Sequence, residues 1–556
     1  MLVLGLNGKF DGHDPAAALL RDGQLAGAVE EERFTRTRHA PTALPHNAAA
    51  WVLAQAGAGL DDVDVVALGW DPRLQPDAPE PAGEGELLDM LLPPTWFPRR
   101  RRPPLLRVRH HLAHAASATA GAPFGRGACL VVDGSGERES ITAWKFDGAT
   151  IDELWSLPYA QSLGFFYEAA TLFTGLGKYS EGKTMGLAAW GDAERYPLPS
   201  PVFDPPVAVA GEPDSGHYLD VLRGWIDRFA AVTGQRRLRR VKVGPPAAAT
   251  LTTRTPEIGR AYRDLAAAVQ HTLQREMLAL ARQALADAGA TRLCLAGGVA
   301  LNCVANGVLA TALNADQIYL PPAAHDGGVA LGAAAWATTR AGIAVRLPDH
   351  HVYAGPAWSA GAVADLLTGW GLPFSAPDDP EEGVAELLAE GSVVARFAGQ
   401  AELGPRALGA RSILADPGQA AMLHRVNALK RREVWRPLAP SLPAEHGPSV
   451  FGLSLDSPFM LVSLPVTEAM RELIPAVVHV DGSTRPQLLT EDTNPSYHRL
   501  LTAFAKLTSR PAVLNTSFNV AGPIVLSPEQ AVATFMTSGI DVLAIEGLLV
   551  RKDGRG

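Results

Sequence analysis

Two stretches of this 556-residue chain repeat one pattern, although they lie far apart in the sequence. Each consists of an apolar strand, a polar glycine turn, a second strand and a hairpin turn marked by Asp-Gly. The copies cover residues 3–25 and 130–148, and their glycine turns are Asn7-Gly8 and Asp133-Gly134. A repeated strand–turn–hairpin unit points to an internal duplication, and therefore to a mixed α/β fold built from two similar halves.

The duplication resembles the actin-like superfold, in which paired hairpins hold the phosphates of a nucleotide between two lobes. A long amphipathic helix is predicted over residues 262–288 and ends at Gly289. It leads into a buried strand at Leu293–Ala296 and then into Gly297-Gly298. Such a glycine turn would leave backbone N–H groups available for a nucleotide or its phosphates.

A candidate metal site follows from the segment His110–Ser117. If this segment is helical, His110 and His114 lie one turn apart on the same face. Asp133, at the end of a buried strand, could join them, as could the distant Asp326. Two imidazoles with one or two carboxylates suit iron, zinc or manganese rather than calcium. From spacing alone, a histidine pair is also compatible with a surface or capping position.

The C-terminal part carries arginines among glycine, proline and serine next to apolar strands. A strand predicted at Val393–Phe397 precedes the arginine-bearing loop 404–412. Arginines in such surroundings suit bidentate binding of oxyanions, whereas the alternative is a set of surface ion pairs. We favour anion binding for four of them and surface pairing for Arg431; the four are Arg406, Arg411, Arg436 and Arg485.

Composition narrows the function further. The net charge of −9 argues against nucleic acid as the main partner. The sequence contains no uninterrupted apolar run of about 18 residues, so we expect no membrane span. The first residues have the pattern of a strand rather than of a signal peptide. Three scattered cysteines, Cys129, Cys294 and Cys303, fit a reducing compartment. We therefore expect a cytoplasmic protein whose oligomeric state the sequence does not define.

Taken in order, these motifs resemble the O-carbamoyltransferases of antibiotic biosynthesis and nodulation-factor modification, above all those acting on tobramycin-type aminoglycosides. The resemblance runs almost end to end, and the ordered set is more specific than any one motif. The matching segments are Leu4–Gly8, His13-Asp14, Glu30–Phe34, His110–Ser117, Val132–Gly134, Ser162–Tyr167, Gly182–Gly186, Gly297-Gly298, Gly404–Arg411, Arg436-Pro437, Ser483–Pro486 and Asn515–Asn519.

The resemblance implies two domains joined by a linker, at residues 1–346, 347–360 and 361–556. The first resembles actin-like, metal- and ATP-binding proteins that transfer threonylcarbamoyl to tRNA. The last resembles threonylcarbamoyl-AMP synthases. There, carbamoyl phosphate would be hydrolysed to carbamate, which attacks ATP to give carbamoyl-AMP. The first domain would then transfer the carbamoyl group to a hydroxyl. ATP, carbamoyl phosphate, Mg²⁺ and a divalent metal, with Fe(II) preferred by family, are the implied cofactors.

The resemblance also implies roles for individual residues, by the motifs that match. His13 would be the general base, grouped with Asp14 and Arg38 as catalytic. The metal would be held by His110, His114, Asp133 and Asp326. ATP or carbamoyl-AMP would contact Asn7, Gly8, Gly134, Lys183, Gly297, Gly298 and Asn302. Carbamoyl phosphate would contact Arg406, Arg411, Lys430, Arg436, Arg485 and Asn515.

Some features depart from the family pattern or leave alternatives open. Arg38 stands where the family has lysine, which keeps the cation but changes its geometry. The segment at Gly522-Pro523 is one residue short and lacks the usual carboxylate. His325 could be an additional metal or phosphate contact or only a neighbour of Asp326.

The acceptor is expected to be a small natural product, either an aminoglycoside or a glycosylated macrolide. The proline-rich segments 72–104 and 197–246 would line its pocket as insertions outside the core. A sugar kinase-like phosphotransferase of the same superfold is the alternative function. That function would explain the paired hairpins but not the arginines or the histidine pair.

Overall fold

The computed structural model describes residues 1–8, 12–74, 83–206, 217–239, 258–313, 318–348 and 350–552. They form two compact units. Unit 1 contains the described residues up to Ala354, and unit 2 those from Gly355 onward. The predicted segments 72–104 and 197–246 fall partly outside the described residues.

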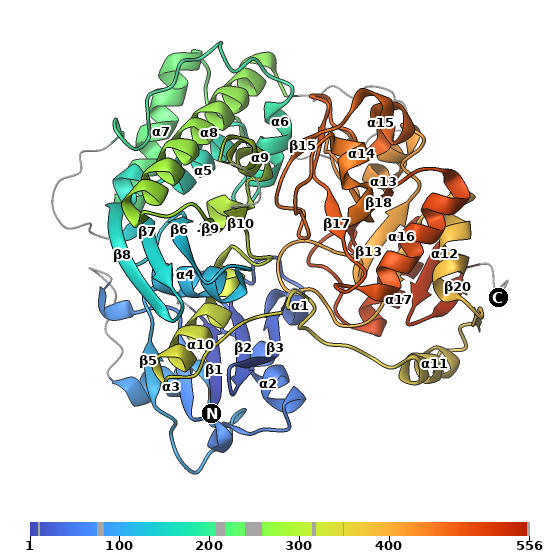
Figure 1. The fold of residues 1–556 in the computed structure, drawn as a ribbon, viewed down its shortest axis with the longest axis horizontal. Helices are drawn as coiled ribbons and strands as arrows, with labels where there is room; N and C mark the ends of the chain where they lie inside the picture. The colour runs from blue at the N-terminus through green and yellow to red at the C-terminus, as the bar shows by residue number, and fades with distance from the viewer. Residues whose placement is uncertain are drawn as a thin grey trace. The chain divides into compact units, whose positions relative to one another are not determined.

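Unit 1 contains two five-stranded sheets with the same topology (Figure 1). In each, three successive strands form antiparallel hairpins, a later strand pairs in parallel with the first strand, and a fifth strand pairs in parallel with that later strand. This repeat confirms the mixed α/β, actin-like fold predicted from the duplicated sequence. The first sheet has the order β3 (Gln24–Glu30), β2 (Ala16–Arg21), β1 (Leu2–Asn7), β4 (Val65–Leu68), β5 (Leu105–Arg107). The second has the order β8 (Thr150–Pro158), β7 (Glu139–Asp147), β6 (Arg126–Val132), β9 (Leu293–Ala296), β10 (Ile318–Tyr319).

Two helices pack against each other and connect these sheets. Helix α4 (His110–Gly121) packs on β6 and β9, and α10 (Val329–Arg340) packs on β1, β2 and β4. Both helices are rich in alanine and glycine, so their backbones approach closely. A Cβ atom placed on Gly332 would lie only 1.8 Å from the carbonyl oxygen of Ala113. The position of α4, which carries the histidine pair, is thus fixed by a contact that only glycine allows.

Helix α8 (Arg260–Ala288) covers the second sheet on its β6, β7 and β8 strands, as predicted for residues 262–288. Its apolar stripe, which includes Leu265, Val269, Leu273 and Met277, is buried. The helix packs against α5 (Leu163–Phe173), α6 (Glu181–Ala188) and α9 (Cys303–Ala312). Gly289 ends it in the left-handed conformation, with φ 60°.

The first proline-rich segment is not wholly an insertion. Helix α3 (Glu84–Leu91) buries Leu87, Leu88 and Leu91, so this part contributes to the packed interior. Its leucines recur at positions that share one helix face, which the surrounding prolines obscure in the sequence. None of the helices in the described residues is long and apolar enough to span a bilayer.

Unit 2 is built on one eight-stranded mixed sheet. Helices α12 (Pro380–Ala389) and α16 (Pro495–Thr508) pack on each other and share a buried cluster with its central strands. The predicted strand at 393–397 is β12. The sheet order is β11 (Phe374–Ser375), β20 (Leu548–Arg551), β19 (Val542–Ile545), β12 (Val394–Phe397), β13 (Arg411–Ala415), β18 (Val513–Ser517), β14 (Ala439–Pro443), β17 (Gln487–Leu489).

The close contact between α4 and α10 makes a testable prediction. Gly332→Ala should lower the free energy of unfolding by about 1–3 kcal/mol or more, because the new methyl group must displace the Ala113 backbone. Gly361→Ala is the matched control: this exposed glycine of helix α11 (Ala360–Gly369) has open space around it. The control should raise stability by about 0.5–1 kcal/mol. Denaturant unfolding of both variants measures the difference, and equal stability would contradict the packing described.

Candidate metal centre and cationic cluster

Four side chains of unit 1 converge on one point, as the sequence predicted. His110 and His114 project from successive turns of α4, Asp133 follows β6, and Asp326 begins the short 3₁₀ helix Asp326–Gly328. The Nε2 atom of His110 lies 3.5 Å from both Asp133 Oδ2 and Asp326 Oδ1. The Nε2 atom of His114 lies 3.2 Å and 3.5 Å from the same two oxygens.

These distances fit a bound divalent metal ion. Ligands about 2.0–2.2 Å from a metal, at right or tetrahedral angles, are about 3.0–3.5 Å from one another. In addition, His114 Nε2 and Asp133 Oδ2 are buried without a hydrogen-bond partner among the described residues. Two imidazole nitrogens with two carboxylate oxygens form a mixed donor set suited to iron, zinc or manganese.

The electrostatics of the cluster also favour a cation. Burial lowers the pKa of His110, but the carboxylates of Asp326 and Asp133 outweigh burial and raise that pKa well above its ordinary value. Burial and the charge of Asp326 raise the pKa of Asp133, yet its contacts with His110 and His114 hold that pKa below its ordinary value. Burial raises the pKa of Asp326 too, but His110 and His114 hold it well below its ordinary value, so both aspartates are ionised at neutral pH and positive charge stabilises the cluster.

Contacts behind the ligands fix their orientation. His110 Nδ1 lies 3.2 Å from the carbonyl oxygen of Gly69, so the ring directs Nε2 toward the aspartates. The neighbouring His111 points elsewhere and forms a hydrogen bond of 3.0 Å with Thr142. Burial lowers the pKa of His111 to about 3, so this ring is neutral. Of three histidines in the motif, only the pair at helical spacing belongs to the cluster.

His13 lies beside this cluster and is oriented by Asp14. Its Nδ1 atom is 2.9 Å from Asp14 Oδ2 and 4.0 Å from Asp326 Oδ2. The other Asp14 oxygen contacts His39 Nδ1 at 2.9 Å, and the His39 ring stacks on Tyr179. Burial lowers the pKa of His13, but Asp14 and Asp326 outweigh burial and raise it to about 9. No local pattern in the sequence indicates that His39 and Tyr179 surround this pair. Arg38 is exposed on the adjoining turn.

His325 forms an ion pair rather than a metal contact. Its Nε2 atom lies 3.0 Å from Glu30 Oε1. The other oxygen of Glu30 pairs with Arg33 at 2.6 Å, and Arg33 also pairs with Glu32 at 2.9 Å. Burial lowers the pKa of His325, but Glu30 outweighs burial and raises it to about 9. Glu32 Oε2 in turn accepts the backbone N–H of His39, at 2.7 Å. A chain of polar contacts thus runs from the Asp326 loop back to the surroundings of His13.

Three of the seven predicted nucleotide contacts, Gly134, Gly297 and Gly298, lie beside Asp133 or Val132, but several of the seven have internal partners. Asp133 Oδ1 accepts the N–H groups of Gly134 and Gly298. The Asn7 amide donates to the carbonyl oxygens of Asp14 and Asp326. Asn302 caps α9 and pairs with Gln270. Gly8 lies against Pro45, Lys183 lies on α6, and Gly297 adopts φ 89° against the Val132 backbone. Their roles toward ATP stay predictions.

In unit 2, three guanidinium groups lie near enough to one another for their charges to interact: those of Arg432, Arg436 and Arg485. Arg432 follows α13 (Ala421–Leu429), and its Nε donates to Asn427 Oδ1 at 2.6 Å. Its Nη2 atom is buried without a hydrogen-bond partner in the part of the chain that the structure describes. Burial lowers the pKa of Arg432 well below its ordinary value, and the charges of Arg436 and Arg485 lower it further. Glu433 offsets part of this charge, since it lies 3.8 Å from Arg436 and raises the pKa of Arg432, but the positive charge of the three arginines still suits an oxyanion. Arg432, which is not among the predicted anion ligands, joins the two predicted arginines.

Three other predicted anion ligands of unit 2 have structural contacts instead. The Arg411 guanidinium is buried over the Phe397 ring and donates to the carbonyls of Ala398, Ala410, Pro356 and Gly399. Lys430 donates to Asn519 and Ser517. The Asn515 amide donates to Ser441. Burial lowers the pKa of Arg411 to about 10.

Arg406 sits in a loop organised by a buried carboxylate. Glu402 Oε1 accepts the backbone N–H groups of Leu408, Ala410 and Arg411 at 2.8–3.1 Å. Glu402 therefore sets the conformation of the loop around Arg406, although Glu402 is not among the residues predicted from the sequence.

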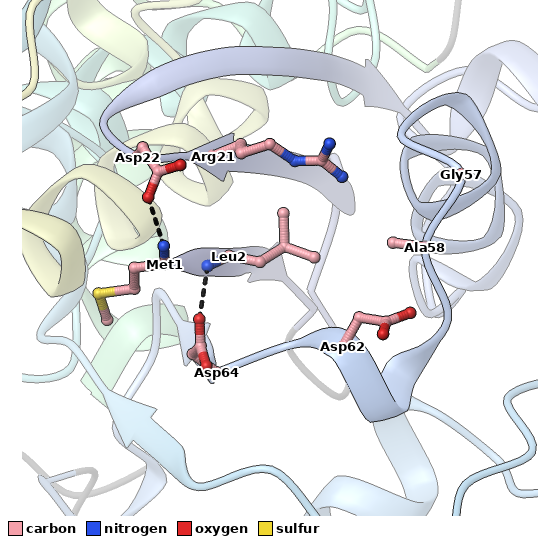
Figure 2. A pocket seen from close by; sticks show the side chains of 8 residues that line it. All are labelled: Met1, Leu2, Arg21, Asp22, Gly57, Ala58, Asp62 and Asp64. Atoms are coloured by element: carbon pink, nitrogen blue, oxygen red, sulfur yellow. Dashed lines mark hydrogen bonds and ion pairs between the residues drawn. The ribbon is translucent and has the colours of Figure 1, made fainter.

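A hollow on unit 1 lies away from this chemistry (Figure 2). It is lined by Met1, Leu2, Arg21, Asp22, Gly57, Ala58, Asp62 and Asp64. Asp22 pairs with the N-terminal ammonium group, and Asp64 accepts the N–H of Leu2. The hollow surrounds the start of β1, whereas Asn7 and the metal cluster lie at the opposite end of this strand.

An actin-like unit with a candidate metal centre, joined to a unit with a cationic cluster, is consistent with a group-transfer enzyme. Two family descriptions match the chain: Carbamoyltransferase N-terminus over residues 89–198 and 243–335, and Carbamoyltransferase C-terminus over residues 385–552. The chain belongs to the carbamoyltransferase family, as the motif order predicted, and is therefore an enzyme of that class.

Individual relatives support the same assignment. The chain is 36% identical to Nodulation protein NolNO of Sinorhizobium fredii, over 99% of this chain and 83% of the relative. It is 39% identical to Nodulation protein NolO of Bradyrhizobium diazoefficiens, over 80% and 79% respectively. A solved structure, the (R)-2-hydroxyglutaryl-CoA dehydratase component A of Acidaminococcus fermentans, matches 62% of this chain and 99% of its own. Its sequence identity to this chain is 15% and the TM-score is 0.34, so this similarity is too weak to support a conclusion about the chain.

The candidate metal centre predicts the behaviour of one variant. His114→Ala removes one of four ligand atoms and should reduce bound divalent metal to background. His350→Ala, which removes an exposed histidine of the same unit, should leave the metal content unchanged. Elemental analysis of purified, metal-loaded proteins measures this. Full occupancy in His114→Ala would rule out the ligand assignment.

Proposed function

We propose that the protein is an ATP-dependent O-carbamoyltransferase that uses carbamoyl phosphate. The observation that carries the proposal is the pairing of two features in one chain of this family. Unit 1 has a buried His₂Asp₂ cluster, and unit 2 has a separate cluster of three arginines. A kinase of the same superfold has no need for the second cluster.

In unit 2, Arg432, Arg436 and Arg485 would bind carbamoyl phosphate, a small polyanion that fixed guanidinium groups recognise. Water would cleave carbamoyl phosphate to carbamate and phosphate. A carbamate oxygen would then attack the α-phosphorus of ATP, with pyrophosphate as the leaving group, and form carbamoyl-AMP. Because free carbamate decomposes in water, the reaction needs a site from which bulk solvent is excluded.

In unit 1, an acceptor hydroxyl would attack the carbonyl carbon of carbamoyl-AMP and release AMP. His110, His114, Asp133 and Asp326 would hold a divalent metal, with Fe(II) preferred by family, whose charge would offset that of the phosphate. Asp14 holds His13 through Nδ1 and leaves Nε2 to take the proton of the hydroxyl. A pKa of about 9 makes His13 a stronger base, although a smaller fraction of it is unprotonated at neutral pH.

The proposed acceptor is a small natural product with a free hydroxyl group, either an aminoglycoside or a glycosylated macrolide. The resemblance to the antibiotic-modifying members of the family supports this choice. Mg²⁺ would accompany ATP as its usual counterion. The negative net charge of the chain supports a small molecule, rather than nucleic acid, as the partner.

The test is to follow nucleotide products with ATP, carbamoyl phosphate and an aminoglycoside acceptor. The wild-type protein should form AMP and pyrophosphate only when carbamoyl phosphate is present. Arg485→Ala should lose this turnover by a factor of about 10–150, because a charged hydrogen bond contributes about 1.5–3 kcal/mol. Arg551→Ala, which removes an exposed arginine of unit 2, should retain it.

Each contrary outcome has a distinct meaning. ADP in place of AMP would support the sugar kinase-like alternative. Unchanged turnover in the Arg485→Ala variant would show that the arginine cluster takes no part in the reaction. AMP formation without carbamoyl phosphate would contradict the proposed carbamoyl donor.

A further inference from the structure

Glu137 occupies a central position behind the metal cluster without belonging to it. Its side chain is fully buried, with 0% exposure. Its Oε1 atom accepts the backbone N–H of Asp71 at 2.9 Å and that of His110 at 3.0 Å. Its Oε2 atom lies 3.1 Å from the same His110 nitrogen. One carboxylate therefore joins the segment after β4, the first turn of α4 and its own turn between β6 and β7.

Helix α4 depends on this carboxylate because it has no local cap. The residue before it, Arg109, provides no side-chain hydrogen bond to the first turn. The first N–H groups of a helix have no partner within the helix, and leaving one of them buried and unsatisfied is costly. A carboxylate at this end also interacts favourably with the helix dipole. Glu137 thus acts as a cap that comes from a distant part of the sequence.

The same contacts connect the segments that supply the metal ligands. Glu137 stands four positions after Asp133, in the turn that begins with Asp133-Gly134. Asp71 stands two positions after Gly69, whose carbonyl oxygen contacts His110 Nδ1. Tyr159 holds the turn from the other side by donating to the carbonyl oxygen of Gly136 at 2.6 Å. A displacement of Glu137 would therefore move His110 relative to Asp133.

We infer that Glu137 is a positioning residue that sets the distance between the histidine ligands on α4 and the Asp133 ligand. It would thereby determine the metal affinity of unit 1. This inference rests on the proposed function, because the metal centre is part of that proposal. A purely structural role would instead change the stability of the fold and leave the metal affinity of the folded protein unaltered.

The test uses Co²⁺ as a probe on the full-length, metal-free protein, followed by visible absorption to obtain the dissociation constant. Glu137→Ala should raise the dissociation constant about 10–100-fold, the range typical of groups that orient metal ligands. Glu137→Gln should raise it less, because one amide oxygen can still accept the N–H groups of Asp71 and His110. Glu153→Gln is the matched control. It removes an exposed carboxylate whose hydrogen bond is to the Arg109 side chain, not to the α4 backbone.

Hydrogen exchange of the peptide that covers residues 105–121 tests the cap itself, in the absence of metal. Faster exchange in Glu137→Ala than in wild type, together with weaker Co²⁺ binding, supports the inference. Faster exchange with an unchanged dissociation constant would overturn it, since Glu137 would then be only a cap. If Glu137→Ala does not fold, the Glu137→Gln protein decides between the same outcomes. Failure of the wild-type protein to bind Co²⁺ would overturn the metal centre, and the inference with it.

Discussion

The carboxylates of Asp133, which is buried, and Asp326, which is half-buried, face a common point, and the surroundings of unit 1 stabilise both of them. Burying an uncompensated carboxylate costs several kcal/mol, and two that face each other also repel. The compensation comes from His110 and His114 on one side and from the N–H groups of Gly134 and Gly298 on the other. A site held in this balance has a strong preference for a cation and little tolerance for a shift of any ligand.

The duplicated fold explains how such a site can form from distant segments. Strand β1 ends in Asn7 and strand β6 is followed directly by Asp133, so these two polar residues reach the same region of unit 1. Asn7 then ties the His13-Asp14 segment to the Asp326 loop through its side-chain amide. Helix α4 carries the two histidines, and its close contact with α10 sets its position. Gly332 of α10 permits this contact because it has no side chain. A strand end and helix packing therefore position three of the four ligands, and Asn7 holds the segment that carries the fourth, Asp326.

The sequence predicts only those parts of this arrangement that have a recognisable pattern in neighbouring residues. The spacing of His110 and His114 follows from the helical period, and the place of Asp133 follows from the apolar strand before it. The pairing of His325 with Glu30 has no such signal, because it joins residues from opposite ends of unit 1. Arg411 illustrates a different limit. A guanidinium that binds an oxyanion and one that binds backbone carbonyls look alike in sequence, and only burial over Phe397 distinguishes them.

Buried glutamates that accept backbone N–H groups recur in both units and suggest why the sites are rigid. Glu137 serves α4, Glu31 accepts the Ala48 N–H at the start of α2 (His46–Gln55), and Glu402 serves the Arg406 loop. In α2 and α4, no side chain at the N-cap position forms a capping bond. A cap within the helix keeps its hydrogen bonds when the helix moves as a whole. A glutamate from another segment can accept the helix N–H groups only when the helix and that segment are in the correct relative position. Each of these elements is therefore capped only when it is correctly placed, which couples the geometry of the site to the stability of the fold.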